Sequence, residues 1–111
     1  MGHLTLPWAL HRRWVGRLET EFFAQGDRER ARGDGGGGSG GAAPQISFLM
    51  DRRAPGVTQC QLGFLDLVAA PLFGALARAF PRAAPMRAAL EANRAIWARE
   101  QAAAGEAAAA P

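Results

Sequence analysis

The sequence contains no lysine, one cysteine and two histidines among its 111 residues. The single cysteine, Cys60, excludes an intramolecular disulfide bond and argues against a cysteine-based zinc site. All 13 basic side chains are arginines, which we interpret as part of a compositional bias that also enriches glycine and alanine. A sequence pI of about 10.9 would suit a nucleic-acid partner, but the arginines are spread along three expected helices and are not gathered on one face. We therefore expect no nucleic-acid binding.

Long hydrophobic segments are also missing. No apolar run reaches about 18 residues, so we expect no membrane span. The N-terminal residues lack an apolar stretch followed by a small-residue cleavage site, so we expect no secretory signal and a cytoplasmic location. The glycine-rich and alanine-rich parts leave roughly two-thirds of the chain to form a core, which is little for an independently folding domain.

The first segment, residues 1–33, is dominated by one amphipathic helix that we expect from Pro7 to about Ala31. Its apolar side chains recur every four residues, and this spacing places them on one face of a helix. The glycine-rich residues 34–45 cannot bury apolar surface, so we expect a flexible or disordered insertion there. The apolar residues of the helix are Leu10, Trp14, Leu18 and Phe22, with Val15 and Phe23 widening the stripe.

Residues 46–99 are expected to form a turn-rich loop and two further helices, and nothing in the chain predicts a strand. The second helix is expected from Val57 to Phe80, with a kink at Pro71. The third is expected from Ala83 to about Ala104, where it runs into an alanine-rich tail, residues 100–111, that we expect to be disordered. The predicted buried positions are Leu65, Val68, Leu72, Leu76 and Phe80 on the second helix and Met86, Leu90, Asn93 and Trp97 on the third.

Three sequence blocks carry a resemblance to one protein family. They are EFFAQGDRER at 21–30, ISFLMDRRAP at 46–55 with CQLGFLD at 60–66, and N-R-x-x-W at 93–97. These blocks resemble those of class I 3′,5′-cyclic nucleotide phosphodiesterases, which carry an EFF-x-QGD block, a short P-x-(C/M)-D-R loop, a Q-x-G-F helix and a closing N-R-x-x-W helix. The resemblance covers about residues 8–99 apart from the insertion. It implies an all-α fold of three main helices, which would be the C-terminal part of such a catalytic domain.

The resemblance also implies a function in signal transduction, the hydrolysis of cAMP or cGMP to the 5′-nucleoside monophosphate. In the family, the glutamine of Q-x-G-F hydrogen-bonds the purine edge and the phenylalanine stacks on the ring. Positions i and i+3 share a helix face, and a carboxamide offers both donors and an acceptor. The residues that would bind the cyclic nucleotide here are Gln61, Phe64, Leu18, Phe22, Leu49 and Trp14. Without the resemblance, Leu18, Phe22 and Trp14 would be interpreted as core.

The chemistry of the family requires two divalent metal ions, zinc and magnesium or manganese, held by histidines and aspartates. This chain has only His3 and His11, and the H-x-x-x-H and H-D motifs of the family are absent from it. We expect no catalytic residue in this chain, no metal ion bound by its own residues and no hydrolysis by the chain alone. The missing N-terminal part of the catalytic domain would supply the metal site. The alternative is a catalytically inactive remnant that acts as a helical interaction module. The sequence leaves the choice between cAMP and cGMP and the oligomeric state open.

Overall fold

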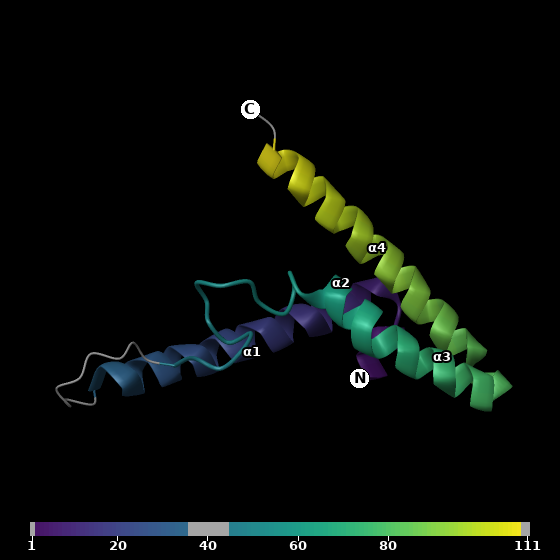
Figure 1. Ribbon diagram of the computed structural model, residues 1–111, viewed down its shortest axis with the longest axis horizontal. Helices are drawn as coiled ribbons and strands as arrows, with labels where there is room; N and C mark the ends of the chain where they lie inside the picture. Colours follow the sequence, from purple (N-terminus) through teal and green to yellow (C-terminus); the bar gives the residue numbers. More distant parts are fainter. Residues whose placement is uncertain (1, 36–44, 110–111) are drawn as a thin grey trace. The chain divides into compact units, whose positions relative to one another are not determined.

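The computed structural model describes residues 2–35 and 45–109 of the chain (Figure 1). These residues form three main helical segments with no strand among them, which confirms the predicted all-α fold. They divide into two compact units, the first comprising Met1–Trp14 with Gln59–Pro111 and the second comprising Val15–Thr58. The predicted glycine-rich insertion, residues 34–45, lies outside the described residues except at its two ends.

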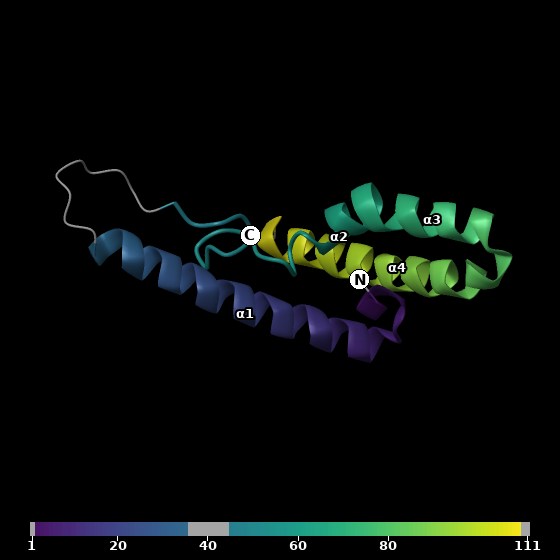
Figure 2. The same ribbon diagram turned by 90° about the horizontal axis from the view of Figure 1, so that it is seen from below.

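The first unit is built around its C-terminal helix. A continuous helical stretch, in which a π-helical turn separates two α-helical parts, packs against that helix, and Figure 2 shows α3 beside α4. The N-terminal 3-10 turn also contacts the C-terminal helix. The elements are η1 (Gly2–Thr5), α2 (Gln61–Phe64), the π-helical turn η2 (Leu65–Ala69), α3 (Ala70–Ala79), the 3-10 turn η3 (Pro81–Ala83) and α4 (Ala84–Ala109). The buried apolar side chains are Leu4, Leu65, Ala69, Phe73, Leu90 and Trp97.

The buried face of the second helical stretch differs from the one we predicted. Leu65 is buried, but Val68, Leu72 and Phe80 are 46%, 50% and 62% exposed. The buried positions after Leu65 are instead Ala69 and Phe73. A π-helical turn holds more residues than an α-helical turn, so η2 shifts the phase of all residues that follow it. This turn ends two residues before Pro71, which cannot donate a backbone hydrogen bond, and it is the irregularity found near the predicted kink.

The C-terminal helix is longer than predicted. We expected an end near Ala104 and a disordered tail at 100–111, but α4 continues to Ala109. The side chains of 99–109 are all exposed, so packing does not account for the extension. Alanine has the highest intrinsic helix propensity, which is sufficient to favour continuation of a helix already begun.

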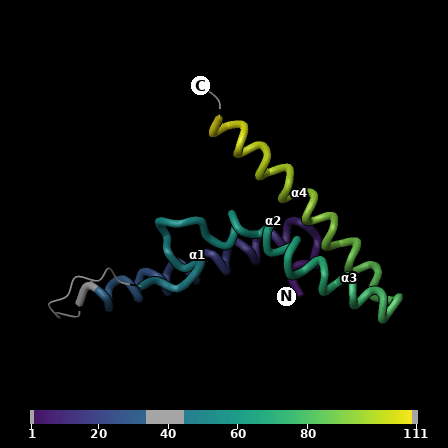
Figure 3. Tube along the Cα trace, in the orientation of Figure 1, coloured from purple at the N-terminus to yellow at the C-terminus, as the bar shows by residue number. Residues whose placement is uncertain are grey.

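The second unit pairs the long helix α1 (Trp8–Gly35), from Val15 onward, with the segment 45–58, whose path Figure 3 traces. The segment follows the helix closely at two glycines. An added Cβ on Gly26 would lie 1.8 Å from the backbone oxygen of Met50, and one on Gly56 would lie 2.5 Å from the ring of Phe23. The backbone amide of Thr58 donates to a carboxylate oxygen of Glu19 at 3.1 Å. The sequence predicted a turn-rich connection here, but it gave no sign of this close contact.

The predicted apolar stripe of α1 is also not its most buried face. Leu10 and Trp14 are 44% and 49% exposed, whereas His11 and Val15, one position further along, are both 0% exposed. The buried face of the helix therefore differs from the face that the apolar spacing favoured. Hydrogen bonds and ring contacts of His11 inside the first unit account for the burial of this polar residue.

Within the described residues, Gln61–Ala79 is the one helical stretch that is long and apolar enough to qualify as a membrane span by length and composition, with a mean hydropathy of 1.5. A helix in the interior of a soluble domain meets the same criteria, so this is a weak candidate. The stretch carries the carboxylate of Asp66, which forms an ion pair with Arg94 of α4.

Candidate functional site

The first part of the candidate site is the short helix α2. The chain enters it through a turn, and the amide of Phe64 donates to the carbonyl of Cys60 at 3.1 Å, which closes the first helical turn. Gln61 and Phe64 stand one turn apart and so share a helix face. The Gln61 side chain is 5% exposed, whereas Phe64 is 37% exposed. The helix therefore presents one buried carboxamide and one partly accessible aromatic ring on the same side.

The carboxamide of Gln61 has an unusual environment. Its oxygen, Oε1, is buried and has no hydrogen-bond partner among the described residues. A buried acceptor without a partner is unfavourable by about 1–3 kcal/mol, so native proteins rarely keep one without a reason. Binding of a donor-bearing ligand would supply that reason.

An ion pair joins η2, the turn that follows α2, to α4. The guanidinium of Arg94 contacts both carboxylate oxygens of Asp66, with Nη2 at 3.1 Å from Oδ2. These hydrogen bonds hold the pKa of Asp66 below its usual range and raise that of Arg94. Both partners are about 40% exposed, so the pair positions the helices more than it stabilises them. The sequence analysis missed this pair, although Asp66 and Arg94 both lie in the recognised motifs.

The second part of the candidate site lies on α1 and the segment that follows it. Leu18 and Phe22 are four residues apart on α1, so they share a face, and both are half-buried. Leu49 is also half-buried and is the one non-glycine residue with a positive φ in the described chain, at 68°. Non-glycine residues seldom occupy this region, and such residues are often found at functional sites.

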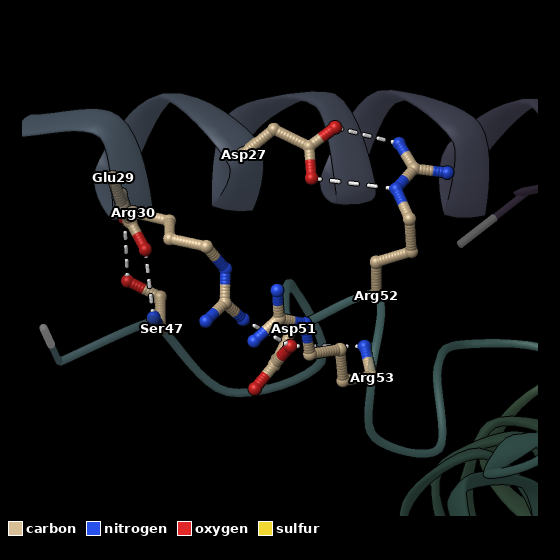
Figure 4. A network of polar contacts seen from close by, with 7 residues as sticks. All are labelled: Asp27, Glu29, Arg30, Ser47, Asp51, Arg52 and Arg53. Atoms are coloured by element: carbon tan, nitrogen blue, oxygen red, sulfur yellow. Dashed lines mark hydrogen bonds and ion pairs between the residues drawn. The ribbon is translucent and has the colours of Figure 1, made fainter. Parts of the chain in front are cut away.

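Two arginine–aspartate pairs hold the segment 45–58 in place (Figure 4). Arg52 donates to both oxygens of Asp27, at 3.3 Å and 2.7 Å, and Arg30 donates to Asp51 at 2.7 Å. The hydrogen bonds from Arg52 lower the pKa of Asp27. The QGDRER block of α1 and the MDRR block of the segment therefore carry opposite charges at facing positions.

Further hydrogen bonds to Glu29 and Asp51 complete this network. The carboxylate of Glu29 accepts from the amide of Ser47 at 2.7 Å and from its hydroxyl at 2.8 Å, which lowers the pKa of Glu29. Asp51 also accepts from the amide of Arg53 at 2.9 Å. Asp51 therefore accepts a hydrogen bond within its own loop and also forms an ion pair with Arg30 of α1.

The six predicted binding residues are distributed over both units. The structure places Trp14, Gln61 and Phe64 in the first unit and Leu18, Phe22 and Leu49 in the second. Their joint contribution to one pocket stays a prediction.

A metal centre is not formed by the residues that the structure describes. No group of three or more histidine, cysteine, aspartate or glutamate side chains among them could hold a metal ion. His3 and His11 do lie together, with their Nδ1 atoms 3.2 Å apart, but these two nitrogens fall short of the usual ligand number.

Comparison with known proteins gives one family. The family model described as 3'5'-cyclic nucleotide phosphodiesterase matches residues 1–90. Over 76 residues, the chain is 32% identical to 3',5'-cyclic-AMP phosphodiesterase 4 of Dictyostelium discoideum. This alignment covers 68% of the chain and 6% of that protein. Over 76 residues it is 37% identical to the dual specificity calcium/calmodulin-dependent 3',5'-cyclic nucleotide phosphodiesterase 1B of Bos taurus and of Mus musculus, covering 68% of this chain and 12% of each. The chain thus corresponds to a small part of these relatives.

Proposed function

Since this chain belongs to the 3'5'-cyclic nucleotide phosphodiesterase family, we propose that it forms the purine-binding wall of an enzyme that hydrolyses cAMP or cGMP to the 5′-nucleoside monophosphate. Gln61 would hydrogen-bond the purine edge and Phe64 would stack on the ring. Leu18 and Phe22 would form the opposite wall, and Trp14 and Leu49 would line the pocket.

The observation that carries this proposal is the buried, unpartnered Oε1 of Gln61 beside the partly exposed ring of Phe64. A purine has hydrogen-bond donors and acceptors on its edge, and its face is flat. The carboxamide of Gln61 is suited to the edge, and the ring of Phe64 is suited to the face. The carboxamide can rotate to offer either its oxygen or its nitrogen, so the same residue could serve adenine and guanine.

The two divalent metal ions that the family implies do not fit the described residues, because no suitable group of ligands occurs there. We therefore assign no reaction step to this chain. Its proposed part in the reaction is to bind and orient the base, and the metal ligands and the proton donor would come from the rest of the enzyme.

The alternative, an inactive helical interaction module, is supported by a different observation. Apolar side chains on the second helical stretch are unusually exposed, with Leu67 at 82% and Leu72 at 50%. Contiguous exposed apolar surface often marks a contact with another protein or domain. A nucleotide-binding part of a larger domain would expose such surface as well, so the two proposals differ in activity and not in this feature.

We expect Phe64→Ala in the full-length enzyme to raise KM for the cyclic nucleotide by about 5-fold to 150-fold, because base stacking is worth roughly 1–3 kcal/mol. The value of kcat should change less, since the ring contacts the base and not the reacting phosphate. Steady-state hydrolysis of cAMP and of cGMP, each with added divalent metal ions, measures both constants.

Leu67→Ala is the matched control for this experiment, because Leu67 lies on the same helical stretch, is 82% exposed and has no proposed contact with the nucleotide. An unchanged KM in Phe64→Ala would show that the ring is not part of the pocket. Absence of turnover with either nucleotide in the unmodified full-length protein would reject the enzyme and favour the interaction module.

A further inference from the structure

A pair of histidines, His11 buried and His3 half-buried, joins the N-terminal turn to the C-terminal helix within the first unit. His11 of α1 is 0% exposed, and its Nδ1 lies 3.2 Å from Nδ1 of His3 in η1. On the other side of the His11 ring, the indole Nε1 of Trp97 in α4 donates to Nε2 at 2.8 Å. The Trp97 ring also packs edge-on against His11 and Trp8. None of these contacts belongs to the proposed nucleotide site.

The donors and acceptors of this cluster determine where its protons lie. Indole nitrogen can only donate, so Nε2 of His11 must accept and carries no proton. A neutral imidazole keeps one proton, which must then sit on Nδ1 of His11. It follows that Nδ1–H of His11 donates a hydrogen bond to Nδ1 of His3, and that His3 carries its own proton on Nε2. The neutral pair satisfies every polar atom in the two contacts.

An additional proton on either facing nitrogen would break one of these hydrogen bonds. Protonation of His11 at Nε2 would point two N–H groups at each other across the contact with Trp97. Protonation of His3 at Nδ1 would do the same across the contact between the histidines. The arrangement therefore excludes the charged form of His11 by geometry as well as by burial.

The charges around His11 act in the same direction. The groups that act on it are His3 of η1 and Arg12 of α1, whose guanidinium also lies over the Trp97 ring at 5.3 Å, while α4 contributes the uncharged Trp97. Burial, reinforced by the charges of His3 and Arg12, lowers the pKa of His11 to about 4 from 6.5, although a hydrogen bond with the backbone of His3 opposes this shift. The pKa of His3 is lowered as well, chiefly by burial.

We propose that His3, His11 and Trp97 form a proton-sensitive clasp that ties η1 to α4 at neutral pH and opens in mild acid. The clasp acts beside a contact that does not titrate, because Nδ2 of Asn93 donates to the carbonyl oxygens of Leu4 and Leu6, both at 2.9 Å. Opening of the clasp leaves this second tether in place, so the N-terminal turn loosens against α4 before the helices separate.

The sign of the pH dependence follows from linkage. Between about pH 6.5 and about pH 4, the open state binds a proton on His11 that the closed state excludes. Closure is therefore fully favourable above pH 6.5, the pKa of a free imidazole, and weakens as the pH falls toward 4. A separation of about 2.5 pKa units corresponds to a loss of up to about 300-fold in the closing equilibrium.

The experiment follows the Trp97 indole N–H by hydrogen exchange and nitrogen-15 NMR on this chain, from about pH 7.5 to about pH 4. The indole signal is assigned with the Trp97→Phe variant. At neutral pH we expect a protected indole and a His11 ring protonated at Nδ1. The protection factor, corrected for intrinsic exchange, should fall about tenfold per pH unit in acid, by up to about 300-fold in total. Asn93 contacts are monitored through the amides of the N-terminal turn.

Two variants separate the histidines. In His11→Gln, the carboxamide can accept from the indole and donate to His3 without titrating in this range, so we expect a loss of protection below about tenfold. In His3→Gln, His11 still titrates and the strong pH dependence should persist. The clasp would be refuted by an unprotected indole at neutral pH, by protection that does not change with pH, or by the same steep loss in His11→Gln.

Discussion

Replacement of Gly26 by alanine is expected to destabilise the second unit by about 3 kcal/mol or more. An alanine Cβ at this position would lie 1.8 Å from the carbonyl oxygen of Met50 and 2.6 Å from its carbonyl carbon. Both are backbone atoms, so rotation of a side chain cannot relieve the overlap. Helix α1 and the segment 45–58 would have to move apart, which would stretch the ion pairs that join them. Urea unfolding followed by circular dichroism measures the change.

The sign of this prediction distinguishes packing from helix propensity. In a helix with free space around it, glycine to alanine is stabilising by up to about 1 kcal/mol. Gly105 provides the control, because it lies in α4 and an added Cβ there meets nothing within 4 Å. We expect Gly105→Ala to be neutral or slightly stabilising. If Gly26→Ala behaved in the same way, the close approach of the segment to α1 would be wrong.

The Gly26 contact shows what the sequence could reveal and what it could not. Apolar spacing and helix-breaking residues predicted three helical segments and a turn-rich connection, because these signals are local. The QGD motif was identified through the family resemblance. Its glycine is required because the backbone of Met50, which is distant in the sequence, lies where a Cβ would be. No local pattern contains that distance.

The errors in the predicted buried faces have a similar origin. Spacing favoured Leu72 on the second helical stretch, yet η2 changes the helical phase and buries Phe73 instead. On α1, the spacing favoured Leu10, whereas the buried residue is His11, a polar side chain that becomes satisfied only through Trp97. A stripe of apolar residues can identify a helix more reliably than it can identify the face that will be buried.

The candidate site was predictable to a different degree in its two parts. Gln61 and Phe64 fall within one contiguous motif, so their common face on α2 follows directly from helix geometry. The charged network of Figure 4 could have been noticed from the opposite charges of two motif blocks, but its pairing, Arg30 with Asp51 and Arg52 with Asp27, depends on how the segment folds back along α1.

Trp97→Ala is expected to be the most damaging substitution in the first unit, with a loss of about 3–5 kcal/mol in the free energy of unfolding. The side chain is 4% exposed, and its ring lies 4.9 Å from that of Trp8 and 5.8 Å from that of His11. Alanine removes these ring contacts and leaves a cavity. It also leaves the buried Nε2 of His11 without its donor.

A second variant separates the two contributions. Trp97→Phe keeps much of the aromatic packing but removes the indole N–H, so its expected loss is about 1–3 kcal/mol, the value for an orphaned buried acceptor. Below about pH 6.5 the loss in Trp97→Phe should shrink, because the substitution removes the acceptor's partner and with it part of the penalty for protonating His11. Equal losses for Trp97→Ala and Trp97→Phe would mean that the hydrogen bond alone matters at this position. A negligible loss for Trp97→Phe would instead show that the packing of this aromatic ring of α4 against Trp8 and His11 holds the N-terminal turn.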